Sequence, residues 1–233
     1  MKLSNIFYLS LTCGYSQAQD SSEDLPLQDG KHLWQQANML QSLVSQVFPD
    51  KRDAFEFVYK YGCYCHSSFR MTGSANNYHG PALDELDSLC RDSHRAQRCL
   101  EDEFGGSLTG ENKRDRSYPW YLDANTNQIV CNNQNNPAWA SRDDNQMRLR
   151  NCLIEKEFVE SIVDLINSGT FERNENWIKM NNNKYANACP TTANGNPGGS
   201  GGKICCGTGL SAKPYNTATK ICCDNEVQEL GTC

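Results

Sequence analysis

Apolar residues recur at helical spacing in three stretches of the chain, each bounded by residues that start or end helices. The first stretch begins at His32 and stops at Pro49, because proline cannot continue a helix. The second is expected to open at Pro81. The third is expected to start near Ser141, where Ser-Arg-Asp-Asp resembles a capping box, and to run to Gly169. The positions that define these helices are Leu33, Ala37, Leu40, Val44 and Val47, then Ala82, Leu86, Leu89, Ser93, Ala96 and Leu100, then Cys152, Phe158, Val159, Ile162 and Ile166.

A short β-hairpin is predicted between the last two helices. The stretch from Tyr118 to Val130 lacks helix signals, and the turn-forming residues 125–127 (Asn-Thr-Asn) separate Tyr121 from Ile129. The pattern therefore predicts a mainly α fold with two long helices and a small β-wing.

The two ends of the chain differ in composition from its centre. A short apolar stretch after Met1-Lys2, followed by small residues, predicts a secretory signal over residues 1–18, although an ordinary N-terminal helix is the alternative. Residues 19–31 form a polar, acidic leader or propeptide. Residues 190–203 have the Gly/Asn-rich composition of a flexible linker, and residues 204–233 form a tail with paired cysteines. The tail has so few apolar residues that only disulfides are expected to order it.

Charge and cysteine content narrow the function classes. The 233 residues carry a net charge of −6 without a block of Lys and Arg, which argues against a nucleic-acid partner. No apolar run approaches the ~20 residues of a membrane span. The 13 cysteines indicate an oxidising compartment, and removal of Cys13 with the signal leaves 13 − 1 = 12, an even number. These features predict a secreted protein.

Cysteine placement predicts how the helices are cross-linked. Cys90 and Cys99 lie nine residues apart, on opposite faces of one helix, so this helix can be bonded to the loop that carries Cys63 and Cys65 and to another element. Cys131 after the hairpin and Cys152 on the third helix are placed to join those two elements. A zinc site at Cys63 and Cys65 is the competing explanation, but only one residue separates them.

Several motifs in this order resemble the secreted phospholipases A2. The resemblance covers residues 32–189, and Tyr-Gly-Cys-Tyr-Cys over residues 61–65 is its most specific part. The other matching pieces are Leu33-Trp34-Gln35, Met39-Leu40, Leu86-Asp87-Ser88-Leu89-Cys90 and Asn127-Gln128-Ile129-Val130-Cys131. The resemblance implies the phospholipase A2-like fold, with an N-terminal helix, two long antiparallel helices and a β-wing. It also implies disulfides that join Cys65 to Cys90 and Cys152 to the wing, and propeptide cleavage after Lys31.

The catalytic positions depart from the family pattern. In the family, a helix-borne His activates water, the adjacent Asp binds calcium, and a second Asp orients the His. The ungapped alignment places Ser93, His94 and Glu155 at these positions, so the dyad is replaced. A register shifted by one residue restores His94 as the base but puts Arg95 at the calcium carboxylate. The ungapped register also accounts for two family disulfides that are lost as pairs, Leu89 with Ser161 and Ala96 with Ile154.

The implied calcium loop is also altered. The resemblance assigns the backbone carbonyls of Tyr64, His66 and Ser68 to the metal, but His66, Ser68 and Phe69 replace glycines. Calcium binding is therefore expected only if the chain is an active enzyme. Gln36 replaces an aromatic residue of the family's acyl channel.

Two functions from different classes follow. The first is a secreted, non-catalytic or weakly catalytic phospholipase A2-like protein that binds an extracellular ligand, a matrix component or a phospholipid surface. The second is a divergent calcium-dependent phospholipase A2 that hydrolyses the sn-2 ester of phospholipids. The tail, with Cys205-Cys206 and Cys222-Cys223, resembles one unit of the double-cysteine repeat of galaxins, proteins of coral skeletal matrix, and this resemblance favours a matrix role.

Overall fold

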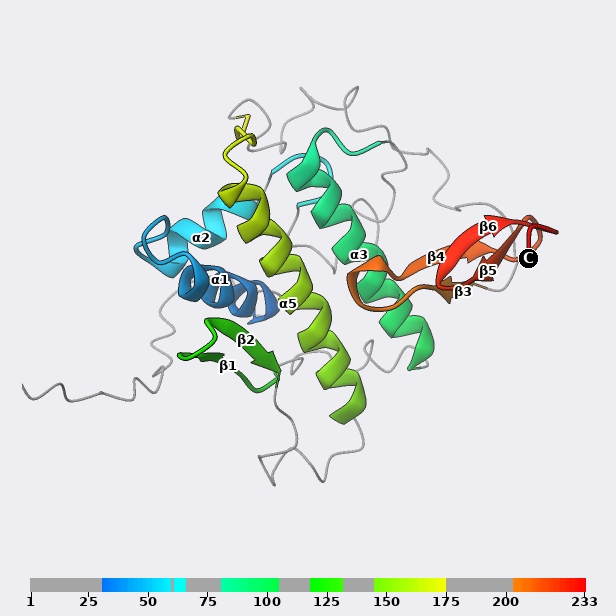
Figure 1. Cartoon of the computed structure of the whole chain (residues 1–233), viewed down its shortest axis with the longest axis horizontal. Helices are drawn as coiled ribbons and strands as arrows, with labels where there is room; N and C mark the ends of the chain where they lie inside the picture. The colour runs from blue at the N-terminus through cyan, green and yellow to red at the C-terminus, as the bar shows by residue number, and fades with distance from the viewer. Residues whose placement is uncertain (1–30, 60, 66–80, 105–117, 132–144, 175–202) are drawn as a thin grey trace, which may run out of the picture.

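The computed structural model of the protein describes residues 31–59, 61–65, 81–104, 118–131, 145–174 and 203–233. Within these ranges the chain forms a disulfide-rich, mainly helical fold with three separate two-stranded antiparallel sheets (Figure 1). The helices are α1 (Lys31–Leu43), α2 (Lys51–Val58), α3 (Glu85–Glu103) and α5 (Asn145–Asn167). The strands and the short 3-10 helix are β1 (Trp120–Asp123), β2 (Gln128–Cys131), β3 (Lys203–Cys206), η5 (Gly209–Ser211), β4 (Lys213–Asn216), β5 (Lys220–Cys223) and β6 (Glu226–Glu229).

The two long helices, α3 and α5, run antiparallel through the centre of the molecule (Figure 1). Two apolar clusters lie along this pair. The larger one joins α3 and α5 to α1, α2 and β2, and its central side chains are Met39, Leu40, Leu86, Ile129, Phe158 and Ile162. The smaller one lies farther along the pair and consists of Ala96, Cys99, Leu100, Met147, Ile154 and Ala212. Buried polar side chains also lie on these two helices: Ser93, Gln97, Asn151 and Glu155.

Two helix boundaries differ from the sequence-based prediction. Helix α1 ends at Leu43 and is followed by a turn, so Val47 is not part of a buried helical face but is 51% exposed. Helix α3 begins at Glu85 rather than Pro81, because the Asp84 side chain caps it and accepts a hydrogen bond from the Asp87 amide at 2.9 Å. The third helix is described from Asn145, and its expected start near residue 141 lies outside the described residues.

Helix α2 was not predicted. It has only eight residues, too few for a clear hydrophobic period. Its local signal is Asp50, whose side chain accepts hydrogen bonds from the amides of Arg52 and Asp53 at 2.7 and 3.0 Å. This N-cap follows Pro49 directly, so the residue that ends the first apolar stretch lies just before the next helix.

The predicted hairpin is confirmed as the β1–β2 pair, in which Leu122 lies opposite Ile129. Its turn contains Asn127 at φ +53°, a conformation that Asn tolerates better than most residues. A disulfide between Cys131 and Cys152 joins the hairpin to α5, as the sequence predicts.

The cysteines of α3 bond in opposite directions, as their spacing predicts. Cys90 is bonded to Cys65 in the loop before the helix, and Cys99 is bonded to Cys205 in β3. Cys63 is also disulfide-bonded, so neither cysteine of the loop is a thiolate that could hold zinc, and the zinc alternative is wrong.

The C-terminal tail consists of two hairpins, β3–β4 and β5–β6. Disulfides between Cys206 and Cys222 and between Cys223 and Cys233 hold them. The expected signal over residues 1–18, the leader up to residue 30 and most of the linker lie outside the described residues. Among the helices of the described ranges, none has the length and apolar character needed to cross a membrane.

Candidate functional site

A mainly apolar pocket opens between α1, α2, α3 and α5. About 540 Å³ of space lies in and around the pocket when the open solvent at its mouth is included. Its polar lining groups are Gln36, Ser93, His94 and the two tyrosines Tyr59 and Tyr64. The remaining lining residues are Ala37, Leu40, Ala54, Phe55, Val58, Cys65, Cys90, Phe158, Val159 and Ile162.

Helical spacing brings these side chains to one cavity. On α1 the lining residues are Gln36, Ala37 and Leu40, separated by one, three and four positions, which places them on a single face. The same spacing recurs at 90, 93 and 94 on α3 and at 158, 159 and 162 on α5. The periodicity that builds the apolar core therefore also forms the walls of the pocket.

Ser93 and His94 both line this pocket, at the positions where the sequence analysis expects the altered dyad. Ser93 is 5% exposed. His94 Nε2 lies 2.6 Å from the backbone carbonyl oxygen of Tyr64. A carbonyl can only accept a hydrogen bond, so Nε2 carries the proton and donates it. In this tautomer Nδ1 is the ring nitrogen that can accept a proton.

The Tyr64 carbonyl is one of the groups expected to bind calcium. Here an imidazole N–H uses one of the two lone pairs of this oxygen, at 2.6 Å. The other two expected ligands, His66 and Ser68, lie outside the described residues. No carboxylate is found among the described residues that line the pocket, and the described part of the chain contains no group of three or more His, Cys, Asp or Glu side chains arranged to hold a metal. The described residues therefore do not fit a calcium site, since calcium prefers anionic oxygen ligands.

A buried carboxylate, Asp87, organises the loop that carries Tyr64. It is fully buried, and its oxygens accept hydrogen bonds from the amides of Tyr64 at 2.7 Å and Leu83 at 2.9 Å. Burial raises the pKa of Asp87 above its usual value, and the backbone amides of Leu83, Tyr64 and Cys63 partly oppose this shift.

Gly62 makes the close approach of this loop to Asp87 possible. Its φ is +58°, and a Cβ at this position would lie 2.3 Å from Asp87 Oδ1. In the sequence, Asp87 and Gly62 stand out only as parts of motifs, and their structural role is not predicted. The indication in the sequence is the position of Asp87, three residues after Asp84, which caps the helix.

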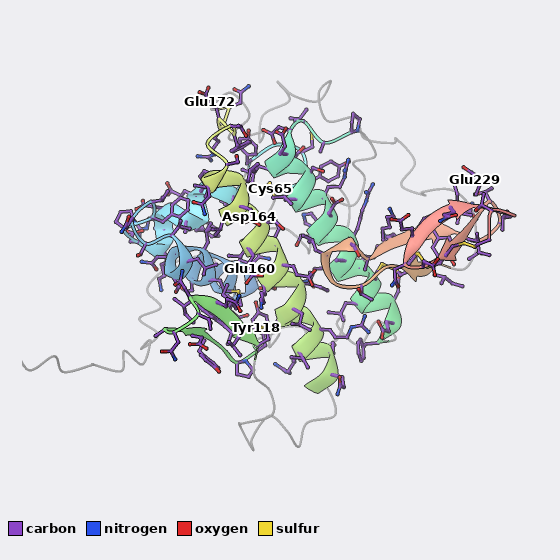
Figure 2. The ribbon with its side chains drawn as sticks, in the orientation of Figure 1. Cys65, Tyr118, Glu160, Asp164, Glu172 and Glu229 are labelled. Atoms are coloured by element: carbon purple, nitrogen blue, oxygen red, sulfur yellow. A yellow bond between two sulfur atoms is a disulfide. The ribbon has the colours of Figure 1, made fainter. Side chains whose placement is uncertain are left out.

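Glu155 belongs to a buried polar layer and is not among the residues that line the pocket. Its Oε2 accepts a hydrogen bond from the Tyr118 hydroxyl, and its Oε1 lies 3.5 Å from Asn151 Nδ2. Asn151 in turn accepts a bond from Gln97 at 2.5 Å. Figure 2 shows Tyr118 between the β1–β2 hairpin and α5. Burial, followed by the charge of Glu155, raises the pKa of Tyr118 well above its ordinary value, so this hydroxyl is a donor.

The exposed charges of α3 form an ordinary solvated surface. Arg91 and Arg95 lie 3.5 and 3.4 Å from the Asp92 carboxylate. Such exposed pairs contribute little to stability. Asp92 is thus paired with arginines of its own helix.

The positions expected to have lost family disulfides lie in different surroundings. Ala96 and Ile154 are both in the smaller apolar cluster. Ser161 lies beside Leu210 of the tail, in a shallow acidic groove, and Leu89 is half-buried against the larger cluster.

The chain matches no protein-family model, and no curated protein matches it at a significant level.

Proposed function

We propose that this chain is a secreted, non-hydrolysing binding protein on a phospholipase A2-like scaffold, and that its pocket holds an apolar chain such as a lipid tail. The observation that carries this proposal is the mainly apolar lining of the pocket, whose described residues include the Ser93 hydroxyl at the position of the expected base and no carboxylate. The disulfides fit an oxidising, extracellular setting.

The scaffold part of the proposal is supported by the order of the elements. An N-terminal helix, a cysteine loop, a long helix, a hairpin and a second long helix follow one another along the chain. The two disulfides that the resemblance implies, Cys65–Cys90 and Cys131–Cys152, are present in this arrangement.

The chemistry of the pocket groups supports the expectation of no hydrolysis. Hydrolysis of an ester by activated water needs a base that can accept a proton and a group that stabilises the developing oxyanion. Ser93 is a hydroxyl at the position of the expected base, and the described lining residues include no carboxylate that could hold a cation beside the Nδ1 of His94. The buried carboxylate Glu155 accepts a hydrogen bond from Tyr118 instead of lining the pocket.

An apolar ligand fits the lining better than a polar one. Ten of the fifteen lining residues are aliphatic, phenylalanine or cysteine, so the pocket offers few hydrogen bonds to a polar molecule. Each methylene that leaves water contributes about 0.8 kcal/mol. The double-cysteine tail resembles a matrix-protein repeat, which supports an extracellular-matrix setting for this binding.

The test combines a binding assay and a hydrolysis assay on the full secreted chain. Displacement of a fluorescent fatty acid reports binding, and Phe55→Lys, which puts a charge into the pocket wall, is expected to weaken it by more than about tenfold. Val47→Lys adds the same charge at a site that is 51% exposed and outside the pocket, and should bind like the unchanged protein.

Hydrolysis is measured on mixed phospholipid micelles with and without calcium, together with His94→Gln. We expect no turnover in any of these conditions. Calcium-dependent turnover that His94→Gln abolishes would overturn the proposal and establish the divergent phospholipase. Equal probe binding by Phe55→Lys and Val47→Lys would refute the pocket as the binding site.

A further inference from the structure

The C-terminal tail is attached to both long helices. A disulfide between Cys99 and Cys205 joins its first strand to α3. On the other helix, Glu157 Oε2 accepts a hydrogen bond from the Leu210 amide at 2.6 Å. In Figure 1, the orange loop between β3 and β4 reaches across α3 toward α5. The tail therefore bridges the two helices by one covalent and one polar contact.

The same loop also completes an apolar cluster. Ala212 is 6% exposed and is buried with Ala96, Leu100, Met147 and Ile154, which come from both helices. The prediction that only disulfides order the tail is thus incomplete, because packing onto the helices contributes as well.

Gly209 permits the close contact between the loop and α5. Its φ is +54°, and a Cβ built there would lie 2.2 Å from Glu157 Oε2. Any larger residue would therefore push the carboxylate away from the Leu210 amide that it binds. Gly231, at φ +90°, has nothing within 4 Å of the corresponding position.

The tail contains a short sequence repeat, and the disulfide of its first copy is made to α3. Lys-Ile-Cys-Cys occurs twice, as β3 and as β5, and each copy is the first strand of a hairpin. In each copy the first cysteine bonds to an earlier residue and the second to a later one. Cys222 thus bonds to Cys206, and Cys205 bonds back to Cys99. Helix α3 supplies the bond that a preceding copy of the repeat would supply.

We infer that the double-cysteine tail is a clasp that holds α3 against α5 from outside the helix pair. Among the described disulfides, none joins α3 directly to α5, so the pair depends on side-chain packing, on polar contacts such as the Gln97–Asn151 hydrogen bond, and on this bridge. The helices that it holds also carry the pocket walls, Ser93 and His94 on one side and Phe158 and Ile162 on the other. The clasp thereby keeps the two walls at a constant separation.

Hydrogen–deuterium exchange of the full chain tests the clasp. The double variant Cys99→Ser with Cys205→Ser removes the disulfide between α3 and the tail without leaving a free thiol. The disulfides within the tail remain. We expect amides in residues 96–103 and 150–161 to exchange at least about tenfold faster, because the helices can then separate locally. Unchanged exchange in both segments would overturn the inference.

A second pair of variants tests the hydrogen bond between the Leu210 amide and Glu157, with every disulfide intact. Gly209→Ala should accelerate exchange in residues 150–161, because the added methyl displaces the Glu157 carboxylate. Gly231→Ala places alanine at another left-handed glycine of the tail that touches nothing, and should leave this segment unchanged. If the two variants exchange alike over α5, the loop does not hold that helix and the clasp is refuted.

Discussion

Substitution of Gly62 by alanine tests how strongly the buried carboxylate organises the site. The new Cβ would lie 2.3 Å from Asp87 Oδ1, 2.4 Å from its Cγ and 2.8 Å from its Cβ. All three distances are too short for non-bonded atoms, and Asp87 is a short, fully buried side chain that has no room to swing aside. The substitution must therefore displace Asp87 or the loop itself.

The magnitude follows from two contributions. Alanine at φ +58° costs about 1 kcal/mol relative to glycine. Displacement of Asp87 breaks at least one of its hydrogen bonds to the amides of Tyr64 and Leu83, and a bond to a charged group contributes about 1.5–3 kcal/mol. We expect Gly62→Ala to lower the free energy of unfolding by about 2.5–4 kcal/mol.

Gly169→Ala provides the matched control. Gly169 follows α5 at φ +66° and has nothing within 4 Å of its Cβ position, so only the backbone cost of about 1 kcal/mol is expected there. Urea unfolding of the oxidised protein, followed by circular dichroism, measures both variants. If Gly62→Ala is within about 0.5 kcal/mol of Gly169→Ala, the account of Asp87 as the organiser of the loop is wrong.

Three further predictions concern the buried polar groups and the disulfides. Because burial raises the pKa of Asp87 above 3.8, the folded state binds its proton more tightly, so the stability should fall as the pH rises from about 4 through the raised pKa. In urea titrations at several pH values, Asp87→Asn should lack this decline. An equal decline in the variant would show that the pH dependence does not come from Asp87. Tyr118→Phe removes a donor to the buried Glu155 and should lower the free energy of unfolding by about 1–3 kcal/mol; a neutral result would show that this hydroxyl is dispensable. The double variant Cys131→Ser with Cys152→Ser opens a link that spans 21 residues and should cost about 3 kcal/mol, whereas unchanged urea midpoints would show that the hairpin is held by packing alone.

Local signals in the sequence account for much of the fold. The apolar period predicts α1, α3 and α5, because each helix must bury one face, and the same period brings Ser93 and His94 to the pocket wall. The predicted ends were less accurate. Helix α3 begins at Glu85 because a side-chain cap decides its start, and α2 is too short to show a period.

The contacts of the site could not be derived in the same way. His94 binds the carbonyl of a residue 30 positions earlier, and Asp87 binds amides of a loop more than 20 positions before it. The resemblance implies that Glu155 stands at the position of the Asp that orients the base, but its hydroxyl partner comes from Tyr118, 37 positions away. Each contact joins segments whose distance is set by helix packing, and no local pattern records that distance.

The sequence by itself determined the helical periods, the hairpin and the opposite directions of Cys90 and Cys99, because these depend on local geometry. Only the tertiary structure decided that Cys99 bonds to Cys205, 106 residues later, and that the Leu210 amide binds Glu157. The physical reason is that disulfides and hydrogen bonds form between whichever groups the packed helices bring within reach, and this depends on the whole fold.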